Sequence, residues 1–203
     1  MTDLNPPAAG AMAAGAPYVV NAEAQRQESY TRFLPLIKWL LVIPHFLVLT
    51  VLYIGVFVAW IIAFFAVIIT GRFPRSLWDF IVGTYRWTWR ATAYYLLMTD
   101  RYPPFTLDDD PDYPVRLELE YPERVARWRP LVQWLLIIPY AIIAYVLGLI
   151  LYVLIFVAFW AILFTKKFPE GLFDLARGFM QWQYRAGAYY GFLVTRYPPF
   201  TLD

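Results

Sequence analysis

Residues 39–70 read WLLVIPHFLVLTVLYIGVFVAWIIAFFAVIIT, a stretch without a single Asp, Glu, Lys or Arg. Residues 130–165, PLVQWLLIIPYAIIAYVLGLILYVLIFVAFWAILFT, are equally free of these residue types. Each stretch far exceeds the roughly 18 apolar residues that indicate a membrane-spanning helix. A chain of 203 residues cannot bury two such stretches in a soluble core. The sequence therefore predicts an all-α integral membrane protein.

The composition narrows the possible chemistry. The chain is 61% hydrophobic and only 16% charged, whereas soluble domains are about 25% charged. It has no cysteine and one histidine, which argues against disulfides, thiolate nucleophiles and histidine-rich metal sites. The net charge of +2 is too small to indicate binding of nucleic acid. We therefore expect the lipid bilayer, rather than nucleic acid, to be the first partner.

The two apolar stretches belong to two copies of one unit. Residues 32–108 align with residues 127–203 at an offset of 95 without a gap, with about 34 identities in 77 positions. Both copies end in the same eight residues, RYPPFTLD. This pattern divides the chain into a disordered tail at 1–17, a first membrane repeat at 18–108, an acidic linker at 109–112 and a second membrane repeat at 113–203.

A short strand is predicted in front of the second apolar stretch. Tyr113–Tyr121 alternates apolar and polar residues, which is typical of a strand with one buried face. The equivalent positions of the first repeat, from Tyr18 onward, have lost the alternation. Because an isolated strand is not stable in water, we expect this one to pair or pack with a partner that the sequence does not identify.

Each long apolar stretch is too long for a simple upright span. Residues 36–70 would form a helix about 52 Å long at 1.5 Å per residue, whereas the hydrocarbon core is about 30 Å thick. The stretch is predicted to be either one tilted helix with an interfacial lead-in before Pro44, or a hairpin of two short arms. A second helix, amphipathic and rich in aromatic residues, is predicted at 76–99 and again at 172–195.

Two arrangements of these elements give four membrane-embedded helical segments, parallel repeats and cytosolic termini. In the favoured one, each long stretch is a hairpin and the amphipathic helix lies on the cytosolic surface, so that nearly all Arg and Lys lie on one side. In the other, the long stretch crosses the membrane once and the amphipathic helix crosses it in the opposite direction. This places Arg86 and Arg90 near mid-bilayer, where each charged side chain costs about 2.5–3.5 kcal/mol. Both describe a multi-pass protein of the inner cell membrane.

Polar residues of the two amphipathic helices gather on one face. Asp79 and Arg90 are eleven residues apart, or about three turns, which leaves them within about 20° of each other. The candidate residues of this polar stripe are Asp79, Arg86, Arg90, Asp174 and Arg185. Three interpretations are open: a face toward lipid headgroups, an inter-repeat clamp, or a transport path. The clamp requires that the two units pack antiparallel about a pseudo-twofold axis, so that Asp79 reaches Arg185 and Asp174 reaches Arg90.

The sequence RYPPF ends both repeats, as Arg101, Tyr102, Pro103, Pro104 and Phe105 and as Arg196, Tyr197, Pro198, Pro199 and Phe200. An arginine suits the negative end of a preceding helix, tyrosine suits the membrane interface, and two prolines stop a helix. We interpret the motif as a helix stop, with docking of a partner as the alternative. The acidic run at 108–112 lacks the ligand spacing of a calcium loop and is interpreted as a solvated linker.

The order of these motifs resembles a known family. The run from Ile43-Pro44-His45 through Gly71-Arg72-Phe73-Pro74 to Tyr102-Pro103-Pro104-Phe105 is similar to bacterial, largely actinobacterial, multi-pass membrane proteins grouped as a domain of unknown function. The resemblance covers both repeats, although the second has Tyr140 at the His45 position and lysines at the Gly71-Arg72 position. It implies membrane residence and no particular activity.

The sequence contains no phosphate-binding loop, nucleophile elbow or metal-ligand pattern, so we expect no enzyme activity and no cofactor. The leading interpretation is a non-enzymatic membrane scaffold or accessory subunit of a cell-envelope complex, with a membrane protein or a second copy as its partner. One alternative is a membrane-shaping protein, because the layout resembles reticulon-type hairpins. The other is a small transporter or channel.

Overall fold

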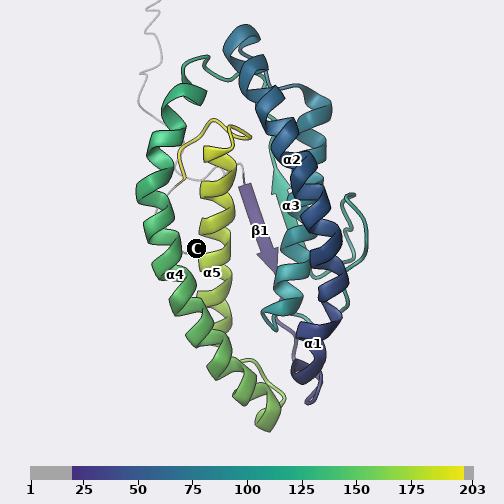
Figure 1. Cartoon of the computed structure of the whole chain (residues 1–203). Coiled ribbons are helices and arrows are strands. Elements are labelled where there is room, and N and C mark those ends of the chain that lie inside the picture. Colours follow the sequence, from purple (N-terminus) through teal and green to yellow (C-terminus); the bar gives the residue numbers. More distant parts are fainter. Residues whose placement is uncertain (1–19, 199–203) are drawn as a thin grey trace, which may run out of the picture.

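The computed structural model describes residues 20–198, apart from the side chains at positions 134, 136, 137 and 139. The predicted tail at 1–17 and the final residues 199–203 lie outside this part. The elements, in chain order, are β1 (Val20–Ala24), α1 (Pro35–Leu41), α2 (Ile43–Thr70), α3 (Arg75–Tyr95), β2 (Val115–Leu119), α4 (Arg129–Thr165) and α5 (Glu170–Tyr190) (Figure 1).

Each repeat contains a strand, a long apolar helix and an amphipathic helix. The sequence predicts all of these elements except the strand of the first repeat. The long stretches are single helices, and the favoured hairpin is wrong. Gly55 and Gly148 lie inside continuous helix, because a lone glycine without polar neighbours does not provide a turn. In the first repeat a short helix, α1, precedes α2 on the N-terminal side of Pro44, and Val42 joins the two.

The two long helices run antiparallel, so the expectation of parallel repeats is also wrong (Figure 1). The start of each long helix lies beside the end of the other. The Tyr30 N–H donates to the carbonyl of Lys166 at 2.8 Å, and the Val125 N–H donates to that of Gly71 at 2.9 Å. The two donors, Tyr30 and Val125, are 95 residues apart, and so are the two acceptors, Gly71 and Lys166. This is the sequence offset of the repeats. A pseudo-twofold axis therefore relates the two repeats.

The strand predicted before the second repeat finds its partner at the equivalent positions of the first. β1 and β2 pair antiparallel with Ala22 opposite Leu117, again 95 residues apart, so that the pseudo-twofold axis passes between these two residues. The prediction that these positions lack the alternation of a half-buried strand is wrong, since Val20 and Ala22 are buried, while Glu23 is exposed. Alanine is only weakly apolar, and two alanines in five residues concealed the pattern.

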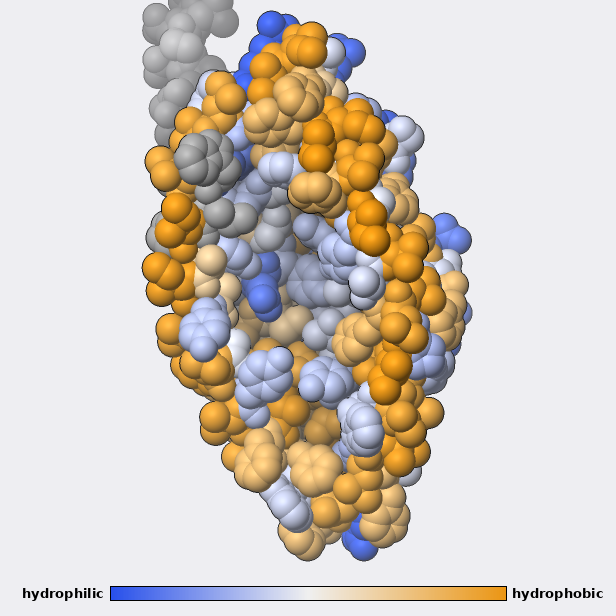
Figure 2. All heavy atoms as spheres, viewed as in Figure 1, coloured by the Kyte–Doolittle hydropathy of each residue, from blue (hydrophilic) through white to orange (hydrophobic). Residues whose placement is uncertain are grey.

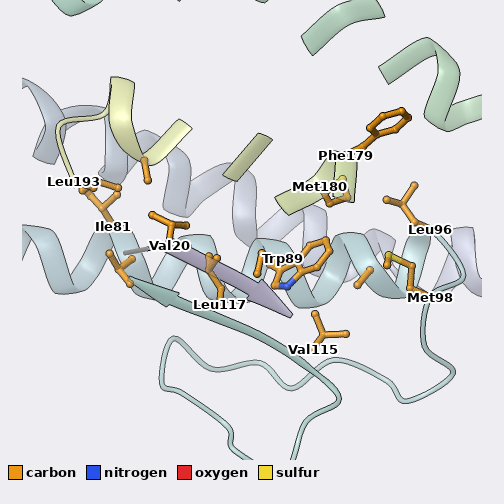
Figure 3. Close-up of a cluster of buried hydrophobic side chains, with 14 of the residues drawn as sticks. Val20, Ile81, Trp89, Leu96, Met98, Val115, Leu117, Phe179, Met180 and Leu193 are labelled. Carbon is orange, nitrogen blue, oxygen red and sulfur yellow. The ribbon is translucent and has the colours of Figure 1, made fainter. Parts of the chain in front are cut away.

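The strands are exchanged between the repeats. β1 packs against α5 of the second repeat and β2 against α3 of the first. Figure 3 shows the resulting core, in which Val20 and Leu117 from the strands lie near Ile81 and Trp89 of α3. Each strand has the same burial pattern, apolar toward the helices and polar away from them. The sheet therefore covers the amphipathic helices with one face and exposes the other.

The long helix and the strands contact opposite sides of α3. On one side, Arg86 Nε donates to the carbonyl of Leu117 at 3.1 Å. On the other side, the hydroxyls of Thr88 and Tyr53 of α2 are 3.0 Å apart. The described residues thus form three layers: the apolar helices α2 and α4, the amphipathic helices α3 and α5, and the two-stranded sheet.

A buried cation ties the start of each long helix to the end of the amphipathic helix. Lys38, whose side chain is 1% exposed, donates through Nζ to the carbonyl of Thr99 at 2.8 Å and to Asp100 Oδ1 at 2.7 Å. In the second repeat Arg129 donates to the carbonyl of Val194, the equivalent of Thr99, at 3.4 Å and to that of Thr195, the equivalent of Asp100, at 2.8 Å. Arg129 is equivalent to Leu34 rather than to Lys38, so the same contact is made from one turn earlier.

Candidate functional site

The outer faces of α2 and α4 form two apolar ridges. Two helical segments are long and apolar enough to span a membrane, Pro35–Thr70 and Tyr140–Thr165. Only 22% of the most apolar 18-residue stretch of the first, and 11% of that of the second, is buried. A core helix of a soluble protein would be mostly buried, so these helices support membrane residence. The ridges consist of side chains that are more than half exposed: Ile54, Phe57, Phe65 and Ile69 of α2, and Ile142, Tyr152, Val153, Phe156 and Phe164 of α4.

A trough lies between the two ridges. Figure 2 shows it as a hollow with polar residues in its interior and apolar residues along both rims. An axial cavity of about 380 Å³ in this trough is lined by α2, α3, α4 and α5. Three pairs of its lining residues are each 95 residues apart: Tyr85 with Met180, Thr88 with Gln183, and Thr92 with Gly187. The cavity therefore lies near the pseudo-twofold axis.

The polar groups of the axial cavity are uncharged. Tyr53 and Thr88 are 3.0 Å apart, and the Tyr140 hydroxyl donates to the carbonyl of Gln183 at 3.1 Å. Desolvation by burial raises the pKa of Tyr85 and of Tyr184 above the ordinary value for tyrosine, so both phenols stay protonated at neutral pH. The described lining offers hydroxyl and amide groups without a formal charge.

An apolar cavity of about 420 Å³ adjoins the axial one and shares Thr92, Met180 and Gln183 with it. Its other walls come from the start of α2, the end of α3 and the middle of α4. They are mostly apolar and aromatic, and they include Phe46, Tyr145, Leu149, Leu151 and Tyr152. The two cavities together present polar groups at one end and apolar groups at the other.

Two cationic cavities lie at opposite ends of the molecule. One, of about 580 Å³, is lined by Arg72, Arg124 and Arg127. The other, of about 570 Å³, is lined by Arg32 and Lys166. Arg32 is equivalent to Arg127 and Lys166 to Gly71, so the pseudo-twofold axis relates these cavities too. Neither described lining contains an acidic side chain.

The acidic members of the predicted polar stripe form local ion pairs. Asp79 pairs with Arg75 at 3.1 Å, and Asp174 pairs with Arg177 at 3.6 Å, all with side chains at least 38% exposed. The inter-repeat pairing of Asp79 with Arg185 is therefore wrong. A carboxylate at the start of an amphipathic helix finds an arginine three or four residues away at lower cost than a partner across the interface.

Two arginines of the stripe, Arg86 and Arg185, connect the repeats through backbone carbonyls, whereas Arg90 bonds within its own repeat. Arg86 donates to Leu117 at 3.1 Å, and Arg185 Nε donates to Val20 at 3.3 Å. Arg90 donates to the carbonyls of Thr106 at 2.7 Å and Asp108 at 3.1 Å. Side-chain-to-backbone contacts of this kind leave no charge pattern in a sequence, so the charged residues could be identified without their acceptors.

Replacing Arg90 with alanine is expected to lower the free energy of unfolding by about 2–3 kcal/mol, because two charge-assisted hydrogen bonds are lost and two carbonyls lose their donor. Thermal unfolding in detergent measures this. Arg177→Ala on the equivalent helix α5 is the control, since its exposed pair with Asp174 contributes about 0–1 kcal/mol. Equal effects of the two substitutions would contradict the assigned contacts.

The first RYPPF motif is a packing element rather than a helix stop. α3 ends at Tyr95, and Leu97 reverses the chain with a φ of 63°, so the helix has ended before the prolines. Phe105 stacks on His45 with 4.0 Å between ring centres, and the Tyr102 hydroxyl donates to Leu41 at 3.2 Å. In the second motif, Tyr197 packs against Tyr189 at 5.3 Å. Pro199 and Phe200 lie outside the described residues.

His45 is a structural residue. It is fully buried, and its Nδ1 accepts a hydrogen bond from Trp87 Nε1 at 2.9 Å. The acidic run is partly structured rather than a free linker, since Asp109 pairs with Arg116 at 3.1 Å. Within the described residues, no group of three or more His, Cys, Asp or Glu side chains could hold a metal ion.

A comparison with family models gives one match, described as a domain of unknown function (DUF4389), which covers residues 35–106 and again 127–201. The two matched segments cover the two long helices, the two amphipathic helices and both RYPPF motifs. The predicted kinship with a repeated family of unknown function is thus confirmed. No curated protein and no solved structure matches the chain.

Proposed function

This chain belongs to the DUF4389 family of domains of unknown function, and we propose that it is a non-enzymatic membrane scaffold lying in the plane of one leaflet. In this arrangement α2 and α4 lie along the membrane with the ridges toward the acyl chains. The pseudo-twofold axis then runs along the membrane normal, and the sheet faces the aqueous phase. The proposal departs from the multi-pass arrangement expected from the sequence.

The position of the charged sheet supports this orientation. Arg86, whose hydrogen bond holds β2 against α3, lies about 16 Å from the start of that helix, which is about 31 Å long. If the helices crossed the bilayer, the outward-facing Arg116 and Glu118, with side chains 30% and 57% exposed, would lie near the centre of the hydrocarbon. Each charged side chain there costs about 2.5–3.5 kcal/mol or more. Lying flat places them in water.

The charges at the ends of the ridges support the same orientation. Because the axis relates the two cationic cavities, a flat molecule holds both at headgroup level in one leaflet, where anionic lipids attract basic residues by about 1 kcal/mol each. A helix with an apolar face, aromatic residues and Arg or Lys nearby is typical of interfacial insertion. The exposed sheet and acidic loop then form the surface available to a partner protein.

Membrane shaping is the second candidate function. Insertion of two antiparallel helices of 28 and 37 residues into one leaflet expands that leaflet relative to the other. Neither role requires a path across the bilayer. A transporter would need the stripe of Asp79 and Arg90 to cross the membrane, whereas Asp79 is paired locally and Arg90 is bonded to backbone.

Reconstitution into dye-loaded vesicles tests both roles. We expect no release or uptake of small ions and dyes above that of protein-free vesicles, at any ratio of protein to lipid. Electron microscopy of the same samples separates the two candidates: smaller or tubular vesicles support membrane shaping, and unchanged diameters support a scaffold alone. Protein-dependent flux would contradict the scaffold and favour a transporter.

A further inference from the structure

The two repeats differ at one position of the trough in a way that opens a binding site. In the first repeat, Tyr53 fills its position, and its hydroxyl lies 3.0 Å from that of Thr88. The equivalent residue of the second repeat is Gly148. A Cβ placed on Gly148 would meet no heavy atom within 4 Å beyond its own helix. The space filled by a phenol in one repeat is therefore open in the other.

This open position lines the apolar cavity of about 420 Å³. The walls beside Gly148 are Phe46 of α2, Leu96 after α3, and Tyr145 and Tyr152 of α4. At Thr92, Met180 and Gln183 this cavity adjoins the polar axial cavity of about 380 Å³. Cavities of about 300–1,000 Å³ with apolar walls and a few polar groups are typical of small-molecule sites.

We propose that the two adjoining cavities bind one uncharged, single-chain amphiphile, with its chain beside Gly148 and its hydroxyl- or carbonyl-bearing head in the axial cavity. The proposal rests on the proposed function, because the trough opens between ridges that face the membrane, from which such a lipid can enter.

The uncharged head follows from the lining. The described walls of both cavities contain no Asp, Glu, Lys or Arg. A phosphate or ammonium group placed there would be desolvated without a counter-charge, which is strongly unfavourable. The hydroxyls of Tyr53, Thr88 and Tyr140 can instead donate to, or accept from, the hydroxyl or carbonyl group of a neutral head. Anionic headgroups have their own complement in the cationic cavities at the ends of the molecule.

The test is photocrosslinking of the full chain in vesicles with a monoacylglycerol that carries a diazirine on its acyl chain, followed by peptide mass spectrometry. We expect crosslinks concentrated on Leu96, Leu151 and Met180, which line the apolar cavity and are buried from bulk lipid. Gly148→Tyr, which copies the first repeat, should reduce them by about tenfold or more. Gly171→Tyr is the matched control, because a Cβ on Gly171 also meets nothing within 4 Å. It should change neither the yield nor the sites of crosslinking.

The reciprocal variant keeps the proposal testable if Gly148→Tyr does not fold. Tyr53→Gly should open the equivalent space in the first repeat and add crosslinks near residue 53. Crosslinks spread evenly along the ridges and insensitive to both variants would show contact with bulk lipid only, and would overturn the site. Stronger crosslinking by the corresponding phosphatidic acid probe would overturn the uncharged head. The orientation of the protein is measured separately by cysteine labelling, so the two proposals can fail independently.

Discussion

Single cysteines placed at Arg72 and at Lys167 will both react with a membrane-impermeant maleimide added to the same side of the membrane. The two residues are pseudo-equivalent, and each follows the C-terminal end of its own long helix. Because α2 and α4 run antiparallel, the two residues lie at opposite ends of the molecule. A flat molecule keeps both ends at the surface of one leaflet, whereas a spanning molecule places them on opposite sides. The natural chain has no cysteine, so each variant reports from one position only.

Two further positions serve as controls for this labelling. A cysteine at Glu118, on the outward face of β2, should react as fast as that at Arg72, because the sheet faces water in the flat orientation. A cysteine at Phe156 on the ridge of α4 should react only after detergent is added. Labelling of Arg72 and Lys167 from opposite sides, together with protection of Glu118, would disprove the flat orientation and restore a multi-pass topology.

Much of the fold could be predicted from the sequence, because the repeat and the apolar stretches are strong local signals. The uncharged run from Trp39 to Thr70 specifies a long helix, and aromatic residues with spaced arginines specify the amphipathic helix that follows. The offset of 95 residues then extends both assignments to the second repeat. These are properties of single segments, which a sequence records directly.

The arrangement of the segments could not be predicted, since it depends on pairings between residues far apart. The decisive contact is the strand ladder centred on Ala22 and Leu117, and one of its two strands carries alanines that hide its pattern. Once β1 pairs antiparallel with β2, the pseudo-twofold axis makes α2 and α4 antiparallel as well. The parallel arrangement of the repeats was predicted wrongly because this one pairing between the strands could not be foreseen.

The candidate site was missed for a related reason. Tyr53 and Gly148 are unremarkable in their own helices, and only their equivalence under the offset of 95 residues shows that one repeat fills a space that the other leaves open. The polar stripe, by contrast, was visible because charges in an apolar segment are conspicuous. Its arginines proved to hold the strands and the loop after α3, so the most visible residues are structural.

Replacing Lys38 with glutamine will lower the free energy of unfolding by about 3–5 kcal/mol, the usual cost of breaking a buried ion pair by removing one partner. Lys38 is 1% exposed and Asp100 is 15% exposed, so the carboxylate left behind is poorly solvated. The carbonyl of Thr99 loses its donor at the same time. Thermal unfolding in detergent, followed by tryptophan fluorescence, measures the loss.

The second repeat suggests a second substitution that should restore the stability lost in Lys38→Gln. It carries glutamine at the position equivalent to Lys38, namely Gln133, and there the cation comes from Arg129 at the position equivalent to Leu34. The double variant Leu34→Arg with Lys38→Gln should therefore regain most of the lost stability, although it restores no lysine. Such recovery is a coupling between neighbouring positions on one helix face, of the size that double-mutant cycles detect.

Leu34→Arg alone separates this rescue from a general benefit of added charge. With Lys38 still present, the new arginine competes for the same acceptors, so we expect it to leave stability unchanged or to lower it. If the double variant is as unstable as Lys38→Gln, the contacts of Arg129 are not transferable and the pseudo-twofold relation does not extend to these helix ends. If it recovers, the two repeats satisfy one structural requirement, a buried cation against the residues that follow the amphipathic helix, from two positions one helical turn apart.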